Sequence, residues 1–268
     1  MRGASAEGLG VALERLEELA EAGDAEAIGA ELLAIFEVLR DEPALRRALT
    51  DPSSDVEART GLAEAVFAGK VSVDAVSALS AAAGSRWASA SDFVATVEHL
   101  GVLAYVIAAD KTGSLAALED DLFRFGRVVS ANPDLRDAIT NSQVPLDHRQ
   151  GLVGELLKDR SSAATVRLAV QAVASPHQSF EAALEGYQEV AAERQSRVVA
   201  LIRSAVDLTD DEHSRLAAAL AHQYGHDVYL NVVVDPQILG GIKVEIGDEV
   251  IDGTVAGRID DARRRMTG

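Results

Sequence analysis

Five glycines lie within LGGIKVEIGDEVIDGTVAGRI, Leu239 to Ile259, and a glycine-rich loop is one of the few short patterns that can bind phosphate. Such a loop leads directly into a helix N-terminus, so that backbone N–H groups and the helix dipole converge on the anion. Here Gly240-Gly241 precedes an alternating, strand-like segment, and Gly247-Asp248 fits a two-residue hairpin turn. Gly253 precedes Thr254, a candidate N-cap for a closing helix. The glycines are therefore predicted to shape the backbone rather than to bind phosphate.

Two histidines raise the possibility of a metal site. His222 and His226 are four residues apart, the spacing of a two-histidine metal face on a helix. Gly225, however, is predicted to end the helix between them, and the glutamate of a metalloprotease motif is missing. Ser175-Pro176-His177 likewise lacks a nucleophile elbow and is interpreted as a surface loop. The sequence thus predicts no catalytic residue, no cofactor-binding residue and no metal ligand.

Two further features have structural interpretations. The run Arg263-Arg264-Arg265 is interpreted as a helix C-terminus that compensates its own dipole. Trp87, the only tryptophan, is either a core residue or an interface anchor, two alternatives that the sequence leaves open.

The net charge of the chain excludes some classes of binding partner. The 268 residues include 43 Asp and Glu against 25 Lys and Arg, a formal charge of -18 that repels nucleic acid and anionic lipid surfaces alike. No cysteine is present, which excludes disulfides and fits a reducing compartment. The longest apolar run, Leu100 to Ala109, is much shorter than the roughly 20 residues of a membrane-spanning helix, and the N-terminal stretch lacks the pattern of a secretion signal. We therefore expect no nucleic-acid binding and no direct membrane insertion.

An internal repeat organises most of the chain. DEPALRRALT, ending at Thr50, recurs as ANPDLRDAIT, ending at Thr140, and this offset of 90 residues also superposes Arg59 on Arg149. Apolar residues within each copy follow a helical period, for example Leu32, Leu33, Ile35, Phe36 and Leu39. Each copy is predicted to contain five or six short helices, with joints near residues 23, 41, 51, 70 and 84 and their equivalents. The segment Ser91 to Lys111 has no strong helix breaker and should serve both copies as one continuous helix.

The pattern changes after Gln195. Thr209-Asp210-Asp211-Glu212 is a capping box that should open a helix. The segments Asp227 to Asp235 and Gly241 to Val250 alternate like strands. The sequence thus predicts an α+β, predominantly α protein: two tandem helical bundles of about six helices each, followed by a small α/β C-terminal domain. The expected domains are residues 1–92 (repeat copy 1), 93–193 (repeat copy 2) and 194–268.

The C-terminal stretch VDPQILGGIKVEIGDEVIDGTVAGRIDDARR resembles the signature of the delta subunit of F-type ATP synthases, the bacterial relative of the mitochondrial oligomycin-sensitivity-conferring protein. Leu100 to Thr140 is similar to the N-terminal helical domain of that family. The extra first copy resembles actinobacterial delta proteins. The signature positions, to which the resemblance assigns structural roles, are Asp235, Gly240, Gly241, Gly247, Asp248, Asp252, Gly253, Thr254, Gly257 and Arg258.

The resemblance implies a non-catalytic stator subunit without cofactor, bound peripherally at the cytoplasmic face of the cell membrane as part of the ATP synthase. Its implied partners are the N-terminal helices of the alpha subunits, expected on copy 2, and the C-terminal helices of the b subunits, expected on the C-terminal domain. Two alternatives stay open. The chain could be a free-standing helical adaptor for amphipathic peptides, or a hydrolase or metal enzyme that uses His222.

Overall fold

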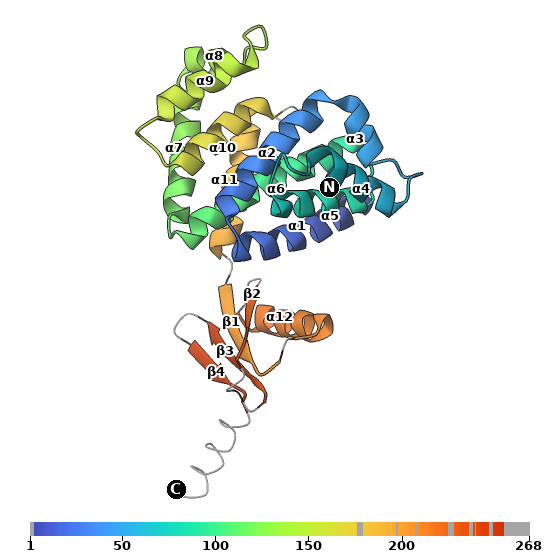
Figure 1. Cartoon of the computed structure of the whole chain (residues 1–268). Coiled ribbons are helices and arrows are strands. Elements are labelled where there is room, and N and C mark those ends of the chain that lie inside the picture. The colour runs from blue at the N-terminus through green and yellow to red at the C-terminus, as the bar shows by residue number, and fades with distance from the viewer. Residues whose placement is uncertain are drawn as a thin grey trace, which may run out of the picture. The chain divides into compact units, whose positions relative to one another are not determined.

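The computed structural model describes residues 3–175, 179–196, 198–206, 208–224, 228–235, 238, 240–246 and 249–254. The chain forms two compact units, Met1–Gln195 and Ser196–Gly268. The first is entirely helical and holds both copies of the repeat; the second contains a four-stranded sheet and one described helix (Figure 1). The predicted fold class, predominantly helical with a small α/β part at the C-terminus, is confirmed.

The helical unit follows the 90-residue repeat closely. Its helices are α1 (Ala4–Ala22), α2 (Ala25–Asp41), α3 (Pro43–Leu49), α4 (Val56–Phe67), α5 (Val73–Gly84), α6 (Ala90–Lys111), α7 (Leu115–Ala131), α8 (Pro133–Thr140), α9 (Leu146–Leu157), α10 (Ala163–Ala174) and α11 (Phe180–Ser196). Adding 90 to the bounds of α4 and α5 gives those of α9 and α10. The predicted joints are therefore confirmed.

Equivalent residues begin and end equivalent helices. Pro43 and Pro133 each occupy the first turn, where proline loses no intrahelical hydrogen bond. Ser72 and Ser162 cap α5 and α10, each hydroxyl accepting a hydrogen bond from the backbone N–H three residues later at 3.2 and 3.1 Å. The two copies thus use the same local chemistry to fix helix boundaries.

The central helix α6 is shared, as the sequence predicted: it closes copy 1 and opens copy 2. By length and composition it could cross a membrane, but 78% of its most apolar window is buried within the helical unit. Helices of both copies pack around it, including α1, α2 and α5 from copy 1 and α7 and α10 from copy 2. Its apolar character is therefore that of a core helix.

Close packing of α2 on α6 depends on two glycines. A Cβ at Gly29 would lie 2.9 Å from a ring carbon of Tyr105, and one at Gly101 would lie 2.6 Å from a methyl carbon of Leu33. Both distances are too short for any larger residue without displacement of the neighbouring helix. Leu33 and Tyr105 are consequently buried, and the backbones of the two helices lie close together.

The second unit is built on a mixed sheet with strand order β2-β1-β3-β4. The elements are β1 (Val198–Ser204), α12 (Asp210–Tyr224), β2 (Val228–Val234), β3 (Ile242–Ile246) and β4 (Glu249–Asp252). Strands β1 and β2 are parallel and joined through α12, whereas β3 pairs antiparallel with β1 and β4. The predicted sequence of strand, helix, strand and hairpin is confirmed; the predicted closing helix, residues 255–265, lies outside the described residues.

Successive side chains along each strand point to opposite faces of the sheet, and the apolar ones on one face form the small core of this unit. Ala200, Ile202, Val244 and Ile246 point to one face of the sheet and pack with Leu220 of α12. The capping box at the start of α12 is confirmed: the Thr209 backbone N–H donates to Glu212 Oε2 at 3.0 Å, and the Glu212 N–H donates to Thr209 Oγ1 at 3.4 Å.

Candidate interaction surfaces

The signature glycines of the second unit form a close backbone contact. Gly241 has φ +83°, and a Cβ there would lie 2.4 Å from the carbonyl oxygen of Gly253. The Gly253 N–H in turn donates to the carbonyl of Ile242 at 3.0 Å. Only glycine fits at Gly241, because both the backbone conformation and the approaching carbonyl exclude a side chain.

The residues after β4 form a side-chain-stabilised turn. Asp252 Oδ1 accepts hydrogen bonds from the Thr254 backbone N–H at 2.9 Å and from the Thr254 hydroxyl at 2.7 Å. These bonds, the hydroxyl first, hold the pKa of Asp252 below its usual value, with a smaller contribution from the charge of Lys243. Thr254 is buried. The pair stabilises the turn at residues 252–254.

The other signature residues are distributed around the same sheet. The Asp235 N–H donates to the Ser204 carbonyl at 2.8 Å, continuing the β1–β2 pairing, and Gly240 has φ +123° just before β3. Gly247, Asp248, Gly257 and Arg258 lie outside the described residues, but Ile246 pairs with Glu249, as a two-residue hairpin turn requires. Both Gly240 and Gly241 precede a strand, so they lack the geometry of a phosphate loop at a helix N-terminus.

The candidates for chemistry are not assembled into a site in the described part of the chain. His222 is exposed on α12, while His226, Pro176, His177 and the three arginines 263–265 fall outside the described residues. Ser175 donates a hydrogen bond to Glu98 at 3.3 Å, so its hydroxyl has a structural partner. Among the described residues, no three His, Cys, Asp or Glu side chains gather as metal ligands would.

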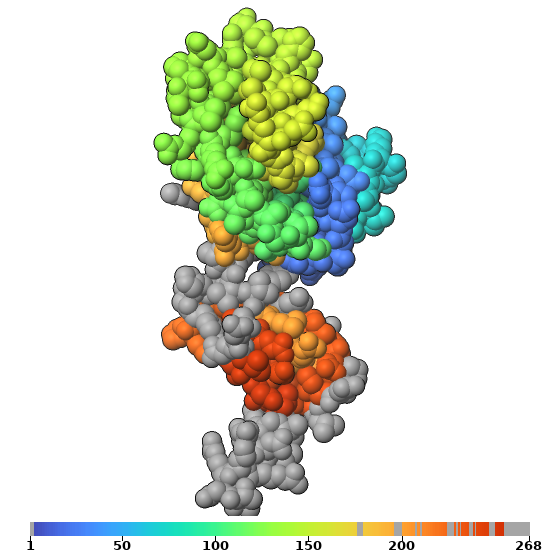
Figure 2. Space-filling model, turned by 90° about the vertical axis from the view of Figure 1, so that its left-hand side faces the viewer, coloured from blue at the N-terminus to red at the C-terminus, as the bar shows by residue number. Residues whose placement is uncertain are grey.

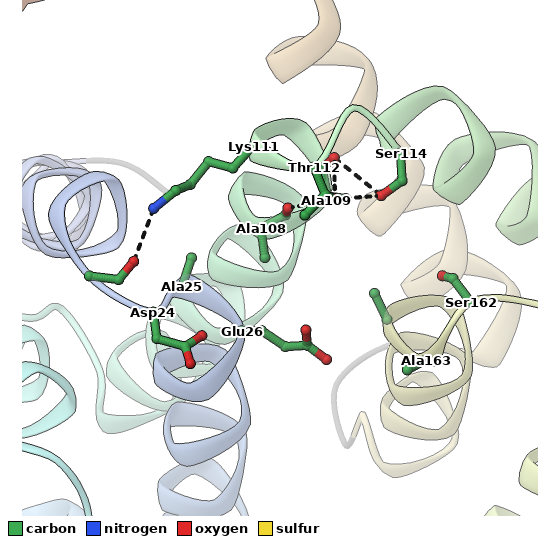
Figure 3. Close-up of a pocket in the computed structure, with 12 residues that line it drawn as sticks. Asp24, Ala25, Glu26, Ala108, Ala109, Lys111, Thr112, Ser114, Ser162 and Ala163 are labelled. Atoms are coloured by element: carbon green, nitrogen blue, oxygen red, sulfur yellow. Dashed lines mark hydrogen bonds between the residues drawn. The ribbon is translucent and has the colours of Figure 1, made fainter.

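A pocket of about 280 Å³ lies where both copies meet (Figure 3). Its walls are the first turns of α2 and α10 and the last turn of α6. The Lys111 ammonium donates to the carbonyls of Ala20, Glu21 and Gly23 at 2.9 to 3.0 Å and so caps α1. With that cation engaged and Asp24 and Glu26 on the rim, the pocket is not suited to an anion.

Sequence reasoning missed a buried carboxylate in copy 2. Glu98 accepts hydrogen bonds from Tyr187 Oη at 2.7 Å, Gln171 Nε2 at 3.0 Å and Ser175 Oγ at 3.3 Å, which tie α6 to α10 and α11. Burial, with the nearby Glu98 charge, raises the pKa of Tyr187. The repeat contained a signal for this carboxylate: at the position of Glu98, copy 1 has Gly8, so the two copies differ there in charge and size.

A buried arginine also escaped prediction. Arg194, near the end of α11, donates to Glu21 of α1 at 2.5 Å and to Asp110 of α6 at 2.7 Å. Its side chain is 5% exposed, whereas the two carboxylate side chains are about one-third exposed. Burial, the largest single effect, lowers the pKa of Arg194. The hydrogen bonds and charges of Glu21 and Asp110 together outweigh it, so the pKa is raised. Arg194 therefore joins copy 1 to the last helix of copy 2.

Trp87 is partly buried and packs against the core of copy 1. Its indole N–H donates to the Ala82 carbonyl at 2.9 Å, and its ring meets that of Phe93 edge-on with centroids 5.8 Å apart. A Cβ at Gly8 would lie 3.1 Å from the indole, so a glycine on α1 makes room for it. Trp87 therefore packs at the edge of the core, with part of its side chain accessible.

Comparison with known proteins identifies the family. The family model for the ATP synthase delta (OSCP) subunit matches residues 103–266, more than half of the chain. The ATP synthase subunit delta of Nocardioides sp. is 46% identical over 275 residues, covering 100% of this chain and 98% of that protein. Those of Streptomyces avermitilis and Streptomyces coelicolor are 43% and 42% identical and cover 98% and 99% of this chain and 98% of each relative.

These relatives define the chain as a structural, non-catalytic subunit of a membrane-associated complex. It belongs to the ATP synthase delta (OSCP) subunit family, and its full-length relatives share the first copy of the repeat. The family suspected from the C-terminal glycines is thus confirmed.

Proposed function

We propose that the chain connects the stationary catalytic head of a rotary F-type ATP synthase to its peripheral stalk. In this proposal copy 2, residues 93–193, binds N-terminal helices of the alpha subunits. The C-terminal domain, residues 194–268, binds C-terminal helices of the b subunits at the cytoplasmic face of the membrane. The observation that carries the proposal is the full-length match to delta subunits in a chain with two separate compact units.

Two units with their own cores suit a connector, because each can hold a different partner while the covalent chain transmits force between them. The helical core runs through both copies, and the second unit has a distinct core around Ala200 and Ile202. Rotor torque would then be resisted between the two binding sites without any chemistry at either.

Charge favours basic partner segments. Residues 1–195 hold 31 of the 43 acidic residues but only 17 of the 25 Lys and Arg, a net charge of -14 on the helical unit. Such a field accelerates association with a basic amphipathic helix, and screening at high salt weakens the effect. We expect the association rate, more than the dissociation rate, to depend on ionic strength.

The first copy supports the second in this scheme. Helix α2 packs along α6 through Gly29 and Gly101, and α1 is joined to α11 by Arg194. Because α6 belongs to both copies, deletion of residues 1–90 would expose its apolar face and test folding rather than binding. Point substitutions in the full chain are the sharper experiment.

Reconstitution tests the connection directly. Membranes and head depleted of this subunit should regain ATP-driven proton pumping when the full chain is added, while ATP hydrolysis by the free head should not change. Restoration of pumping is expected with the wild-type chain and not with a variant whose second unit is unfolded by Gly241→Ala. Unrestored pumping in the presence of folded, bound wild-type chain would refute the proposal.

Peptide titrations separate the two binding sites. Alpha N-terminal and b C-terminal peptides should each bind the full chain by calorimetry, and Gly241→Ala should abolish only the b interaction. A free-standing adaptor would bind other amphipathic peptides as well as these. Equal affinity for unrelated amphipathic peptides would favour that alternative, and absence of both interactions at low salt would contradict the proposed function.

A further inference from the structure

Helices α2 and α7 are equivalent in the repeat but bury different amounts of their surface. Both helices bury five equivalent positions, which on α2 are residues 25, 28, 32, 35 and 39. Helix α2 also buries Gly29, Leu33 and Phe36. On α7 only Leu115, Leu118, Leu122, Phe125 and Val129 are buried. Copy 2 therefore leaves open a helix face that copy 1 closes, and α7 runs along the side that Figure 2 turns toward the viewer.

Three substitutions between the copies explain the difference. Gly29, which allows α2 to approach α6, is replaced in α7 by Glu119, and Leu33 by Phe123. Phe36, fully buried in copy 1, is replaced by Gly126, where an added Cβ would meet nothing closer than Leu184 at 3.8 Å and Gln188 at 3.9 Å. Phe123 is consequently 50% exposed, and the guanidinium of Arg127 lies over its ring, 5.9 Å from the centroid.

We call this face the α7–α11 seam. On α7 it comprises the residues on the Gly126 side of the helix, and on α11 those that share the side of Gln188 by three- and four-residue spacing. Its members are Glu119, Phe123, Gly126, Ser130, Glu181, Glu185, Gln188 and Ala192. These eight positions include three glutamates and no Lys or Arg, and none of the eight residues is buried.

We propose that the α7–α11 seam is a second docking face of the helical unit, for a basic amphipathic helix from another subunit. Such a helix would lay its apolar stripe across Gly126, beside Leu184 and Gln188, and against the exposed ring of Phe123. Its Lys or Arg residues would flank that contact and pair with Glu119, Glu181 and Glu185. Both the apolar and the charged parts of the seam are needed, which distinguishes this partner from an acidic or purely apolar helix.

Peptide binding to the full chain tests the chemistry of the occupant. The probe is a designed helix with a Leu and Phe stripe flanked by lysines, and the matched control peptide carries glutamates in place of the lysines. Amide resonances of Gly126 and Gln188 should shift only with the basic peptide, and Phe123→Ala should weaken its Kd about tenfold, as loss of an aromatic anchor does.

Val128 supplies the control substitution, because it is also 50% exposed on α7 but lies outside the seam. Val128→Ala should leave the Kd unchanged. Equal binding of both peptides, or equal Kd values for Phe123→Ala and wild type, would overturn the proposal. The alpha peptide is titrated in parallel: its failure to bind wild type counts against the proposed function, whereas loss of the basic probe in Phe123→Ala concerns only the seam.

Cross-linking in the assembled complex tests whether the seam is occupied. The chain has no cysteine, so Ser130→Cys and Val128→Cys each introduce a unique thiol for a photoactivated label. Position 130 should cross-link to a basic helical segment of another subunit, identified by mass spectrometry, and position 128 should not. A complex in which position 130 gives no cross-link, or one only to an acidic segment, would contradict the proposal.

Discussion

Asp159 adopts the left-handed conformation, φ +59°, that Gly69 adopts 90 residues earlier with φ +75°. Each follows the C-cap of its helix, α9 or α4, and the next residue donates its N–H to a carbonyl in the last turn: Arg160 to Leu157 at 3.1 Å and Lys70 to Phe67 at 3.0 Å. The repeat has thus kept an unfavourable backbone conformation through a change of residue type, because the turn into the next helix requires it.

Gly69→Ala should lower the free energy of unfolding by about 1–2 kcal/mol, the cost of placing a Cβ in the left-handed region. A matched control is Gly61→Ala. Gly61 is exposed within α4, and nothing lies within 4 Å of an added Cβ there. That change should stabilise the helix by about 1 kcal/mol. Urea unfolding followed by Trp87 fluorescence measures both, and effects of the same sign would contradict the explanation.

Arg194→Ala should destabilise the helical unit by about 2–3 kcal/mol. The substitution leaves two carboxylates without their cation, and the expected cost is below that of a fully buried triad because both carboxylates keep some contact with water. Arg124→Ala, which removes an exposed pair with Asp120, should cost less than about 0.5 kcal/mol. Denaturant unfolding compares the two, and equal losses would show that Arg194 does not join the copies.

Gly241→Ala should unfold the second unit selectively. Positive φ and the clash with the Gly253 carbonyl together should cost about 3 kcal/mol. Because Trp87 lies in the helical unit, its fluorescence transition provides an internal control that should not move. Hydrogen exchange at Ala200 and Val244 should accelerate. A parallel shift of the Trp87 transition would mean that the two units do not unfold independently.

Stability of the helical unit should depend on the protonation of His99. Burial lowers the pKa of His99, so the folded state disfavours its charged form. Since the unfolded chain binds a proton at about pH 6.5, this stabilisation is fully present above that pH and is lost as the pH falls toward the lower folded-state pKa. His99→Gln should reduce the pH dependence of unfolding between about pH 7 and 5, which urea unfolding at several pH values measures; an unchanged pH dependence would contradict the explanation.

Local features were predictable because the responsible residues are close in sequence. Pro43, Pro133 and the Thr209 to Glu212 capping box act within one helical turn, and the repeat transferred the boundaries of copy 1 to copy 2. Contacts between residues far apart in the sequence were not predictable. Arg194 meets Asp110 and Glu21 over 84 and 173 residues, and no periodicity in the sequence relates those positions. The closeness of Gly241 to Gly253 likewise depends on the register of β3 and β4.

Sharing α6 between the copies makes its length a quantity that neither copy can change alone. An α-helix turns about 100° and rises 1.5 Å per residue, so one residue inserted near Gly101 would rotate everything after it relative to α1 and α2. The contacts of Glu98 would then keep their angular position while those of Asp110 would not. Natural insertions and deletions should therefore be confined to the short segments between other helices. The number of residues from Glu98 to Asp110 should stay constant, because it sets the angle between their contacts around the helix axis.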